Sequence, residues 1–427
     1  MKRLLMLALL LATADAASQP ARLITVTQCY DLAREHYPLV KRYGLIDMTE
    51  AYNVANASKG LLPQLAVNAK ATYQSDVTTL PFDVARLAAL MPDLSIPTVS
   101  RDQYQLTAEL SQLLWDGGNI GAAKDLSRSQ ADVERKQLDA ELYALNERVN
   151  QVYFGCLLHD EMLRQNALLK KGLEVNAGRL SAMLGNGLAN TSDLEALEVE
   201  LLNVGQRDIE LNAGRRAYLA VLCALTGLGG EDSLTLDIPN VPGVRAATIN
   251  RPELRALDAQ AEMFDVQRRQ VEAGLMPRLG LFVQGGYGRP GLNMLEDSFE
   301  PFYIAGVRLS WNVGRLYTSK NDRLRIEANR NSVGLQRETF LFNTSLQIIR
   351  HNAEIDKINS LLEADGDILR LRASLRRAAE AKLDNGVIAV ADLIRELNSE
   401  DIARQNAATH RIQLLAAFFN LMHTTNE

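Results

Sequence analysis

Two spacings of apolar residues divide the chain into short alternating stretches and long helical stretches. After Pro63, apolar side chains occupy every second position up to Tyr73. Similar alternation recurs in three later stretches. Period-two alternation over about ten residues is typical of a strand with one apolar and one polar face. The sequence therefore predicts four strands, at about 64–76, 103–115, 278–288 and 302–312.

The long stretches carry apolar residues at alternating spacings of three and four, as in the core seam of a coiled coil. In the first stretch these residues are Leu138, Leu142, Leu145, Val149, Val152 and Cys156, and in the second they are Ile348, Ile355, Ile358, Leu362 and Leu369. No proline lies between Pro97 and Pro239 or after Pro301, and proline is strongly disfavoured inside helices. We therefore expect two long helical hairpins, at about 119–227 and 315–423. A first helix from Asn119 to Leu184 would be roughly 100 Å long at about 1.5 Å per residue.

An Asn-Gly pair interrupts each helical stretch once, and such pairs commonly end a helix. The two pairs are Asn186-Gly187 and Asn385-Gly386. Ser192 and Glu195 predict an S-x-x-E capping box that starts the next helix of the first hairpin. In the second hairpin Asp392 is the best start signal.

The order strand, strand, helical hairpin occurs twice. GLLPQLAVNAKATY at Gly60–Tyr73 returns as GLMPRLGLFVQGGY at Gly274–Tyr287, at an offset of 274 − 60 = 214 residues. Four turn residues precede the first strand of each half: Gly60, Pro63, Gly274 and Pro277. The sequence thus predicts two structural repeats, at 17–240 and 241–427, each turning from a helix into a strand through Gly-x-x-Pro.

The first residues carry an export signal. Lys2 and Arg3 precede an apolar run, and Ala14-Asp15-Ala16 is a cleavage pattern, so residues 1–16 read as a signal peptide. A short membrane anchor is the alternative, although the run is too short to span a bilayer. No later apolar run is long enough for a transmembrane helix.

Composition excludes several classes of function. The net charge of −6 and the lack of a long basic stretch argue against a nucleic-acid partner. Cys29, Cys156 and Cys223 are too few and too far apart for a disulfide framework, and we expect the last two to be buried thiols. Cys29 lacks the apolar lead-in of a lipid-modified cysteine, so no acyl anchor is expected.

No catalytic, metal-binding or cofactor-binding pattern appears. The five histidines are scattered without metal-ligand spacing. Gly286, Gly288 and Gly291 form a G-x-G-x-x-G string, but Pro290 follows where a dinucleotide site needs a helix to begin. We therefore expect neither an enzyme nor a cofactor.

The strand pattern is that of membrane β-strands. The aromatic residues near the strand ends are Tyr73, Trp115, Tyr287 and Trp311, and transmembrane barrels carry such aromatics at both interfaces. A soluble sheet packed on the helices is the alternative. Four strands cannot close a barrel, because about eight is the smallest workable number, and open edges in lipid are costly. A membrane barrel would therefore need at least two copies of the chain.

These repeats, from TVTQCYDLAREHYPLV to the final hairpin, closely resemble the TolC-like family of outer-membrane efflux ducts. The resemblance implies a homotrimer with a shared twelve-stranded β-barrel in outer-membrane lipid and a hollow α-helical barrel in the periplasm of a Gram-negative bacterium. It also implies a passive exit duct of a tripartite efflux pump or a type I secretion system. The partners would be an inner-membrane transporter and a periplasmic adaptor (membrane fusion) protein.

The resemblance places a gate at the hairpin turns. Family gates carry two aspartates, three residues apart, after the second hairpin's turn; here Asp392 matches the first, but Arg395 stands at the second. Asp193 is the counterpart in the first half. The tyrosine and arginine that lock the gate in the best-known member correspond to Leu383 and Ile388, so the resemblance implies a lock built differently.

Other functional classes stay open at this point. A secreted coiled-coil scaffold or adhesive protein without a barrel would show the same heptads. Asp392 could also serve only to stabilise the N-terminus of its helix, and that structural role is compatible with a ring of Asp392 side chains in the lumen. The residues do not indicate the cargo (drug, metal ion or secreted protein) or which pump the duct serves.

Overall fold

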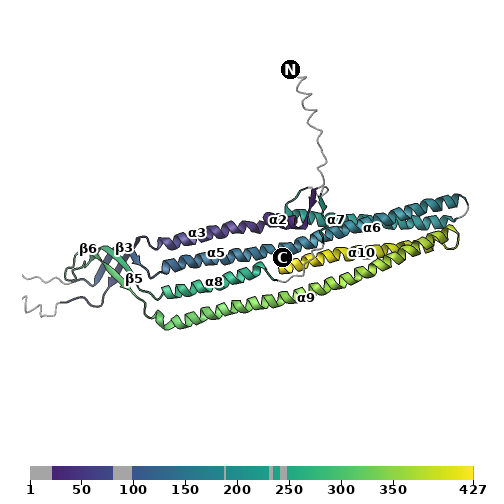
Figure 1. Ribbon diagram of the computed structural model, residues 1–427. Helices are drawn as coiled ribbons and strands as arrows, with labels where there is room; N and C mark the ends of the chain where they lie inside the picture. The colour runs from purple at the N-terminus through teal and green to yellow at the C-terminus, as the bar shows by residue number, and fades with distance from the viewer. Residues whose placement is uncertain (1–21, 80–98, 187–188, 230–233, 241–247, 427) are drawn as a thin grey trace, which may run out of the picture. The chain divides into compact units, whose positions relative to one another are not determined.

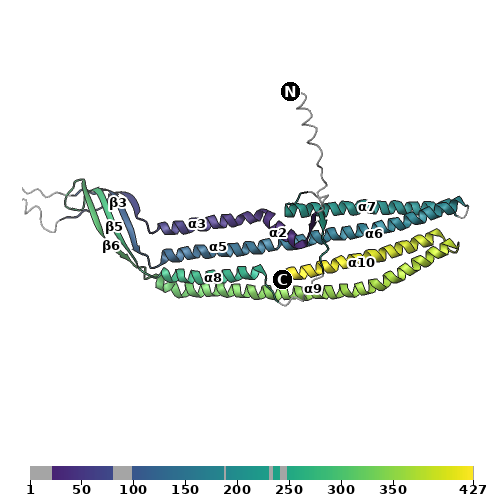
Figure 2. The same ribbon diagram turned by 45° about the horizontal axis from the view of Figure 1, so that its top comes forward.

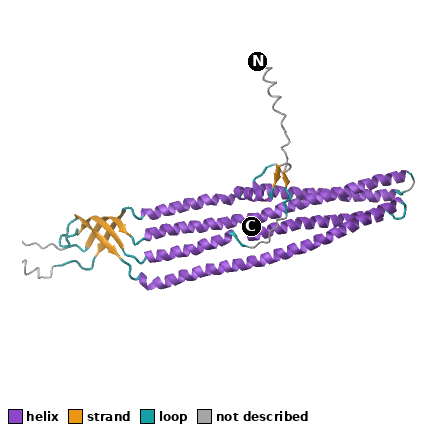
Figure 3. Cartoon of the chain, viewed as in Figure 1, coloured by secondary structure: helices purple, strands orange, loops and turns teal. Residues whose placement is uncertain are grey.

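A computed structural model describes residues 22–79, 99–186, 189–229, 234–240 and 248–426 (Figure 1). The expected signal peptide, Gly187 and most of the connection between the first two strands lie outside these residues. The chain is mostly helical (Figure 3). None of the described helices is long and apolar enough to cross a membrane.

The elements follow one another in the order that the sequence predicts, with additional short elements. The strands are β1 (Arg22–Ile24), β2 (Gln64–Tyr73), β3 (Asp102–Trp115), β4 (Leu234–Leu236), β5 (Arg278–Arg289) and β6 (Glu300–Ser310). The helices are α2 (Val26–His36), the short 3-10 helix η1 (Pro38–Lys41), α3 (Arg42–Lys59), α5 (Asn119–Tyr143), α6 (Leu145–Gly185), α7 (Thr191–Thr226), α8 (Pro252–Ala273), α9 (Arg315–Asp384) and α10 (Val390–Thr425).

The chain forms two compact units, and each takes segments from both sequence repeats. We call Met1–Arg42, Gln137–Leu254 and Arg337–Glu427 the helical unit. Tyr43–Lys136 and Arg255–Gln336 form the sheet unit. The units do not coincide with the two repeats, because corresponding parts of each repeat assemble together. The repeat boundaries themselves stay a prediction.

The four long strands form one antiparallel sheet in the order β2-β3-β5-β6 (Figure 1). The register aligns apolar residues across neighbouring strands: Val67 faces Ala108, and Leu110 faces Val283. In the last pair Leu281 faces Val307. Since side chains alternate between faces, this register gathers the apolar positions of all four strands on one face.

The predicted strand limits need small corrections. β2 ends at Tyr73 instead of continuing to residue 76, and β6 runs over Glu300–Ser310 instead of 302–312. Trp311 therefore follows its strand. A register shift between Leu113 and Trp115 in the pairing of β3 with β5 keeps Trp115 opposite Leu279. This irregularity adds one residue, so Trp115 lies on the same face as Leu279, although strict alternation from Leu113 would place it on the opposite face.

In the helical unit, α6 and α7 form one hairpin and α9 and α10 the other, as Figures 1 and 2 show. The expected first long helix is interrupted between α5 and α6 only by Ala144, which keeps helical dihedral angles and donates to the carbonyl of Ala140 at 3.2 Å. α9 runs for 70 residues without interruption. The absence of proline from these stretches allows such lengths.

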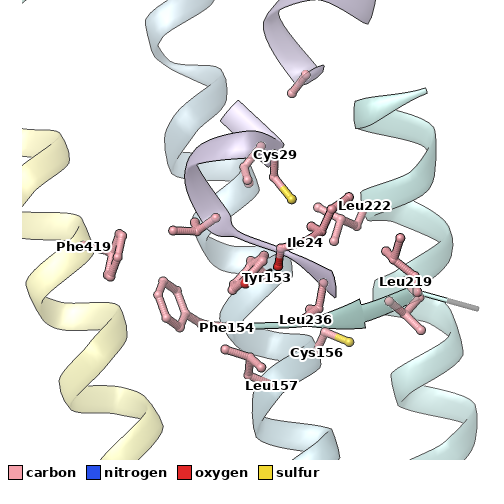
Figure 4. Close-up of a cluster of buried hydrophobic side chains, with 14 of the residues drawn as sticks. Ile24, Cys29, Tyr153, Phe154, Cys156, Leu157, Leu219, Leu222, Leu236 and Phe419 are labelled. Carbon is pink, nitrogen blue, oxygen red and sulfur yellow. Dashed lines mark hydrogen bonds between the residues drawn. The ribbon is translucent and has the colours of Figure 1, made fainter. Parts of the chain in front are cut away.

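The core of the helical unit gathers residues from distant parts of the chain around Tyr153 (Figure 4). The Tyr153 hydroxyl is fully buried and donates to the carbonyls of Ile24 and Asp237, at 2.9 and 2.7 Å. These two residues flank the parallel pair of β1 and β4. Sequence analysis did not find these strands because each has only three residues, too few to show alternation.

All three cysteines lie in this core as free thiols. Burial raises the pKa of Cys29 and of Cys156 to about 12. A thiol with so high a pKa has almost no thiolate at neutral pH and is therefore a poor nucleophile. The expectation that Cys156 and Cys223 are buried is confirmed.

Candidate functional site

The turn of the second hairpin has the geometry that its Asn-Gly pair predicts. Gly386 has φ of +69°, a conformation that a side chain would strain, and its N–H donates to the carbonyl of Leu383 at 2.9 Å. The N–H of Val387 donates to Lys382 at 2.8 Å, which completes a Schellman-type helix end. The Asn385 amide donates to the carbonyl of Ala381 at 2.7 Å.

In the first hairpin the end of α6 resembles the end of α9 as far as Asn186. This residue follows α6, and its side-chain amide donates to the carbonyl of Ala182 at 3.0 Å. Gly187, the matching glycine, is outside the described residues. The structure therefore describes one of the two predicted turn glycines.

The next helix of each hairpin starts with an aspartate in its third position. Asp193 accepts the backbone N–H of Asn190 at 3.4 Å, and Asp392 accepts that of Ala389 at 3.3 Å. The predicted capping box of Ser192 and Glu195 is therefore wrong: the N-cap lies two residues earlier, and α7 starts at Thr191. The N-cap is Asn190, whose side chain competes well for this position.

Asp392 and Asp193 differ in their charged neighbours. The Arg395 guanidinium donates to Asp392 at 2.8 Å, one turn along the same helix. Asp193 has Ala196 at the equivalent position. The pair with Arg395 is exposed, so it contributes well under 1 kcal/mol to stability, but it cancels the charge of Asp392 locally.

The two positions that the resemblance assigns to the gate lock belong to an apolar core. Leu383 is buried and Ile388 packs against the same cluster. This cluster joins both hairpins near their turns, through Leu180 and Leu197 of the first and Leu393 of the second. Both positions therefore take part in apolar packing, and the expectation of a lock built differently from that of the best-known member stays a prediction.

Ion pairs reinforce the contact between the hairpins. Arg179 of α6 donates to Asp384 of α9 at 3.2 Å, close to both turns. Further along, Arg207 of α7 donates to Asp401 of α10 at 3.0 Å. Neither pair could be predicted from the sequence, because a pattern within one helix does not show which residues of another helix lie beside it.

Two adjacent acidic residues of α10 lie in the interior of the helical unit. Glu400 and Asp401 are both buried. Glu400 accepts from Arg376 and Arg404, both at 2.5 Å. Burial raises the pKa of Asp401 above its ordinary value, while Arg207 opposes this shift. Glu400 continues the three-and-four spacing of Leu393 and Leu397, and this was the signal available in the sequence.

In the sheet unit, the apolar face is exposed. Val67 of β2 and Val307 of β6 are each 64% exposed, and Leu106 of β3 is 53% exposed. Soluble proteins rarely expose contiguous apolar patches of this kind. The sheet therefore does not pack this face on helices of the same chain in the described part, contrary to the soluble-sheet alternative.

The four predicted aromatics lie near opposite ends of the strands and are all exposed. Tyr73 and Tyr287 lie toward the end where β2 connects to β3 and β5 to β6. Trp115 ends β3 at the helix-proximal end, and Trp311 follows β6 there, with its indole N–H donating to Leu275 at 2.9 Å. The exposed aromatics therefore lie at both ends of the apolar face, and their role at membrane interfaces stays a prediction.

The opposite face of the sheet carries polar side chains and glycines. Arg308 donates to Glu109 at 2.7 Å, and its guanidinium carbon lies 4.4 Å from the centre of the Phe282 ring. Gly306 leaves room for that ring, since a Cβ there would approach it to 3.1 Å. This arrangement holds Arg308 flat against the sheet.

The predicted turn residues before the strands lie where the chain changes from helix to strand. The Gly60 N–H donates to Ala57 at 3.2 Å and the Gly274 N–H to Gln270 at 3.0 Å, each prolonging a helix end. Pro63 directly precedes β2 and Pro277 directly precedes β5. Proline at these points favours extended backbone in the preceding residue, which ends the helix.

Among the described residues, no group of three or more His, Cys, Asp or Glu side chains is placed to hold a metal ion. The histidine with the largest described shift is His423, whose pKa is lowered to about 4 by burial and by nearby Arg251. Its ring stacks on Tyr143 at 4.5 Å. His423 thus packs in the helical unit, near the C-terminal end of α10.

Comparison with solved structures identifies the fold. The channel protein CusC matches with a TM-score of 0.64 and 13% identity, over 94% of this chain and 91% of that chain. The outer-membrane channel CmeC of Campylobacter jejuni matches with a TM-score of 0.63 and 13% identity, over 94% and 85%. The outer-membrane protein VceC of Vibrio cholerae matches with 0.58 and 14%, over 94% and 95%.

No protein-family model and no curated protein sequence matches the chain. The chain nevertheless has the fold of the TolC-like outer-membrane channels, so the resemblance inferred from its repeats is confirmed at the level of the fold. At this low identity the likeness establishes the fold alone.

Proposed function

We propose that this protein is a passive exit duct in the outer membrane of a Gram-negative bacterium, with its helices in the periplasm. It would serve a tripartite efflux pump or a type I secretion system, together with an inner-membrane transporter and a periplasmic adaptor protein. The observation that carries this proposal is the four-stranded sheet with one continuous apolar face, in a chain with the fold of outer-membrane channels.

Closure of the sheet needs further copies. Within the described part of the chain the outer strands β2 and β6 each pair with one neighbour only, and unpaired backbone groups in lipid cost several kcal/mol each. Three copies in a ring would pair β6 of one chain with β2 of the next and give the twelve-stranded barrel. The trimer is therefore part of the proposal.

Two helices also carry exposed apolar stripes that neighbouring copies of the chain could cover. In the helical unit, α7 leaves Leu202 and Ile209 exposed, and α9 leaves Phe342 and Ile349 exposed. Each pair is separated by seven residues, the spacing of a coiled-coil seam. We propose that the α7 stripe of one chain packs on the α9 stripe of the next.

Cysteine labelling tests the membrane part. Val67 and Asn68 are neighbours on the edge strand β2 and point to opposite faces of the sheet. In outer membranes, a cysteine at position 67 is expected to react with a lipid-soluble maleimide. A cysteine at position 68 should react with a membrane-impermeant one. Equal labelling by both reagents would contradict the barrel and favour the coiled-coil scaffold.

Electron microscopy of detergent-extracted protein tests the assembly. We expect a threefold particle with a shaft of roughly 100 Å, from about 66 helical residues at about 1.5 Å each. A monomeric particle, or recovery only from the soluble fraction, would contradict the duct.

We further propose that the hairpin turns form the periplasmic gate. The residues assigned to it are Asp193, Asp392, Arg395, Asn186, Gly187, Asn385 and Gly386. The apolar cluster that joins Leu197 and Leu393 supports a gate held mainly by packing. Opening would then require separation of this cluster in addition to the ion pair between Arg179 and Asp384.

A further inference from the structure

The polar face of the sheet carries an unbalanced positive charge. The register assigns five charged side chains of the four strands to this face: Lys70, Glu109, Arg278, Glu300 and Arg308. Three are basic and two are acidic, although the whole chain has a net charge of −6. The positions of these charges along the strands decide which of them remain unpaired.

Two of the five neutralise each other. Arg308 of β6 donates to Glu109 of β3 at 2.7 Å, so its side chain reaches across the intervening strand β5. The contact with Phe282 of β5 holds the guanidinium group over that strand. The pair adds no net charge to the face.

Two more lie at the same level of the sheet. Lys70 pairs in register with Gln105, Gln105 with Gly288, and Gly288 with Glu300. Lys70 and Glu300 therefore occupy one cross-strand row, at the end of the sheet remote from the helices. Their opposite charges cancel at that level in any ring made of this sheet.

Arg278 is the charge without a counterpart. It opens β5 at the helix-proximal end, is exposed, and has no acidic side chain within ion-pair distance in the described part of the chain. It lines a hollow of about 170 Å³ on the polar face together with Gln64, Ser111, Phe282 and Arg308. The pairing partner of Arg278, Ser310, is neutral.

Two charged groups that follow strands at this end, Asp116 after β3 and Arg315 after β6, are engaged with backbone groups instead of Arg278. The Asp116 carboxylate accepts the N–H groups of Gly118 and Ile120, at 2.9 and 2.5 Å, at the start of α5. Arg315 donates to the carbonyl of Gly274 at 3.0 Å and adds a second positive charge at this end. The helix-proximal end of the polar face is therefore positive.

We propose that Arg278 makes the duct prefer anionic solutes at the point where the helices give way to the strands. This inference rests on the proposed duct, whose three copies would place three Arg278 side chains around one lumen. Rings of arginine or lysine select for anions because the fixed charges raise the local anion concentration. The chemical class favoured is solutes with carboxylate, phosphate or sulfonate groups.

The test measures ion selectivity of the purified full-length protein in planar lipid bilayers under a KCl gradient. The reversal potential gives the ratio of chloride to potassium permeability. Salt near 0.1 M keeps the Debye length at about 10 Å, so that fixed charges still act across the lumen. We expect a ratio above one, lowered about threefold or more by Arg278→Gln and inverted by Arg278→Glu.

A matched control and a second variant separate the effect of Arg278 from the effect of removing any one arginine of the sheet. Arg289 ends the same strand but points to the apolar face and pairs with Asp297 at 3.4 Å, so Arg289→Gln should leave the ratio unchanged. Arg308→Gln should lower the ratio because it exposes the charge of Glu109. Citrate added on the strand side should block the wild-type current more strongly than that of Arg278→Gln.

The outcomes distinguish this inference from the duct itself. Conductance with a cation preference, or an Arg278→Glu ratio equal to that of the wild type, would overturn the anion preference and leave the duct intact. A properly folded preparation that forms no conducting pores would overturn both.

Discussion

The helical unit and the sheet unit are each assembled from both repeats, but they differ in where their apolar side chains lie. The helical unit buries Tyr153, Phe154 and Phe419 in one core around the β1–β4 pair (Figure 4). The sheet unit exposes a whole apolar face, including Leu65 and Leu309, each 68% accessible. One unit carries its own hydrophobic core, whereas the other presents its apolar surface outward.

This difference indicates what stabilises each unit. Burial of apolar side chains within the chain stabilises the helical unit, at about 25 cal/mol per Å² of apolar area. The sheet unit buries fewer large apolar side chains, among them Ile46 and Val133, and the apolar face of its sheet would gain the corresponding energy only where the lipid or neighbouring copy of the proposed duct covers it. Substitutions should therefore act on the two units under different conditions.

The largest effect is expected from a charge on the apolar face. Val307→Arg should cost about 2–4 kcal/mol per chain at the membrane midplane, and a trimer would carry three such charges. We expect loss of the assembled protein from the outer membrane, detected by fractionation and native electrophoresis. Ser310→Arg, on the polar face of the same strand, is the control and should assemble; equal loss of both would remove the distinction between the faces.

Removal of a core side chain should act on the helical unit without any membrane. Leu222 is fully buried in α7, so Leu222→Ala should lower the free energy of unfolding by about 3 kcal/mol. Leu106→Ala, on the exposed face of β3, should change it by less than about 0.5 kcal/mol in mild detergent. Urea titration followed by circular dichroism measures both, and similar losses would refute the contrast between the units.

Acidification should weaken the helical unit selectively. The pKa of His423 is lowered to about 4, so the unfolded chain binds a proton below about pH 6.5 that the folded chain does not. The contribution of neutral His423 to the free energy of unfolding is therefore fully present above pH 6.5 and is lost as the pH falls toward 4. Between pH 7 and pH 5 the loss is about 2 kcal/mol, at about 1.4 kcal/mol per tenfold change in proton affinity.

The sheet unit provides an internal reference for this pH effect. All five histidines lie in the helical unit, and both tryptophans, Trp115 and Trp311, lie in the sheet unit. Urea unfolding at pH 5 should shift to lower urea in circular dichroism, to which the helical unit contributes most of the helical residues, but much less in tryptophan fluorescence, which reports the sheet unit alone. His423→Phe keeps an aromatic ring beside Tyr143 and should flatten the dependence; an unchanged slope would assign it to other groups.

The smallest effect concerns the two helix-start aspartates. Asp193→Ala and Asp392→Ala should each cost about 1 kcal/mol, as loss of a helix-terminal acceptor usually does. In planar bilayers, Asp392→Ala should also alter conductance or divalent-cation block if it lines the gate. Because Arg395 already pairs with Asp392, Asp193→Ala should change divalent-cation block more. No change for either variant would leave both residues as helix caps only.

The sequence predicted best those strands and helices whose apolar residues recur at a regular spacing. Period-two alternation located all four long strands to within a few residues, and the absence of proline located the two long helical hairpins but not α2, α3 or α8. The register in the sheet follows from the same alternation, because a one-residue slip would turn every side chain to the other face. The turn glycine Gly386 was predictable because few residues adopt its positive φ.

Features that depend on contacts between distant segments could not be predicted in this way. The β1–β4 pair joins residues more than two hundred positions apart, and neither strand has a pattern of its own. The N-cap of α7 went to Asn190 because Asn and Ser are nearly equal in this role, so context decided. The contacts of Arg308 with Glu109 and Phe282 form only when strands β3, β5 and β6 are paired in register.

The interleaving of the repeats also governs the order in which the protein can fold. The chain emerges from its N-terminus, yet the sheet unit needs residues up to Gln336 and the helical unit needs Arg337–Glu427. β2 and β3 are thus finished long before β5, the next strand of their sheet. During that interval the β2–β3 hairpin exposes its apolar face and an unpaired strand edge. Chaperones should therefore protect the chain against aggregation mainly while the first repeat is complete and the second is still being synthesised.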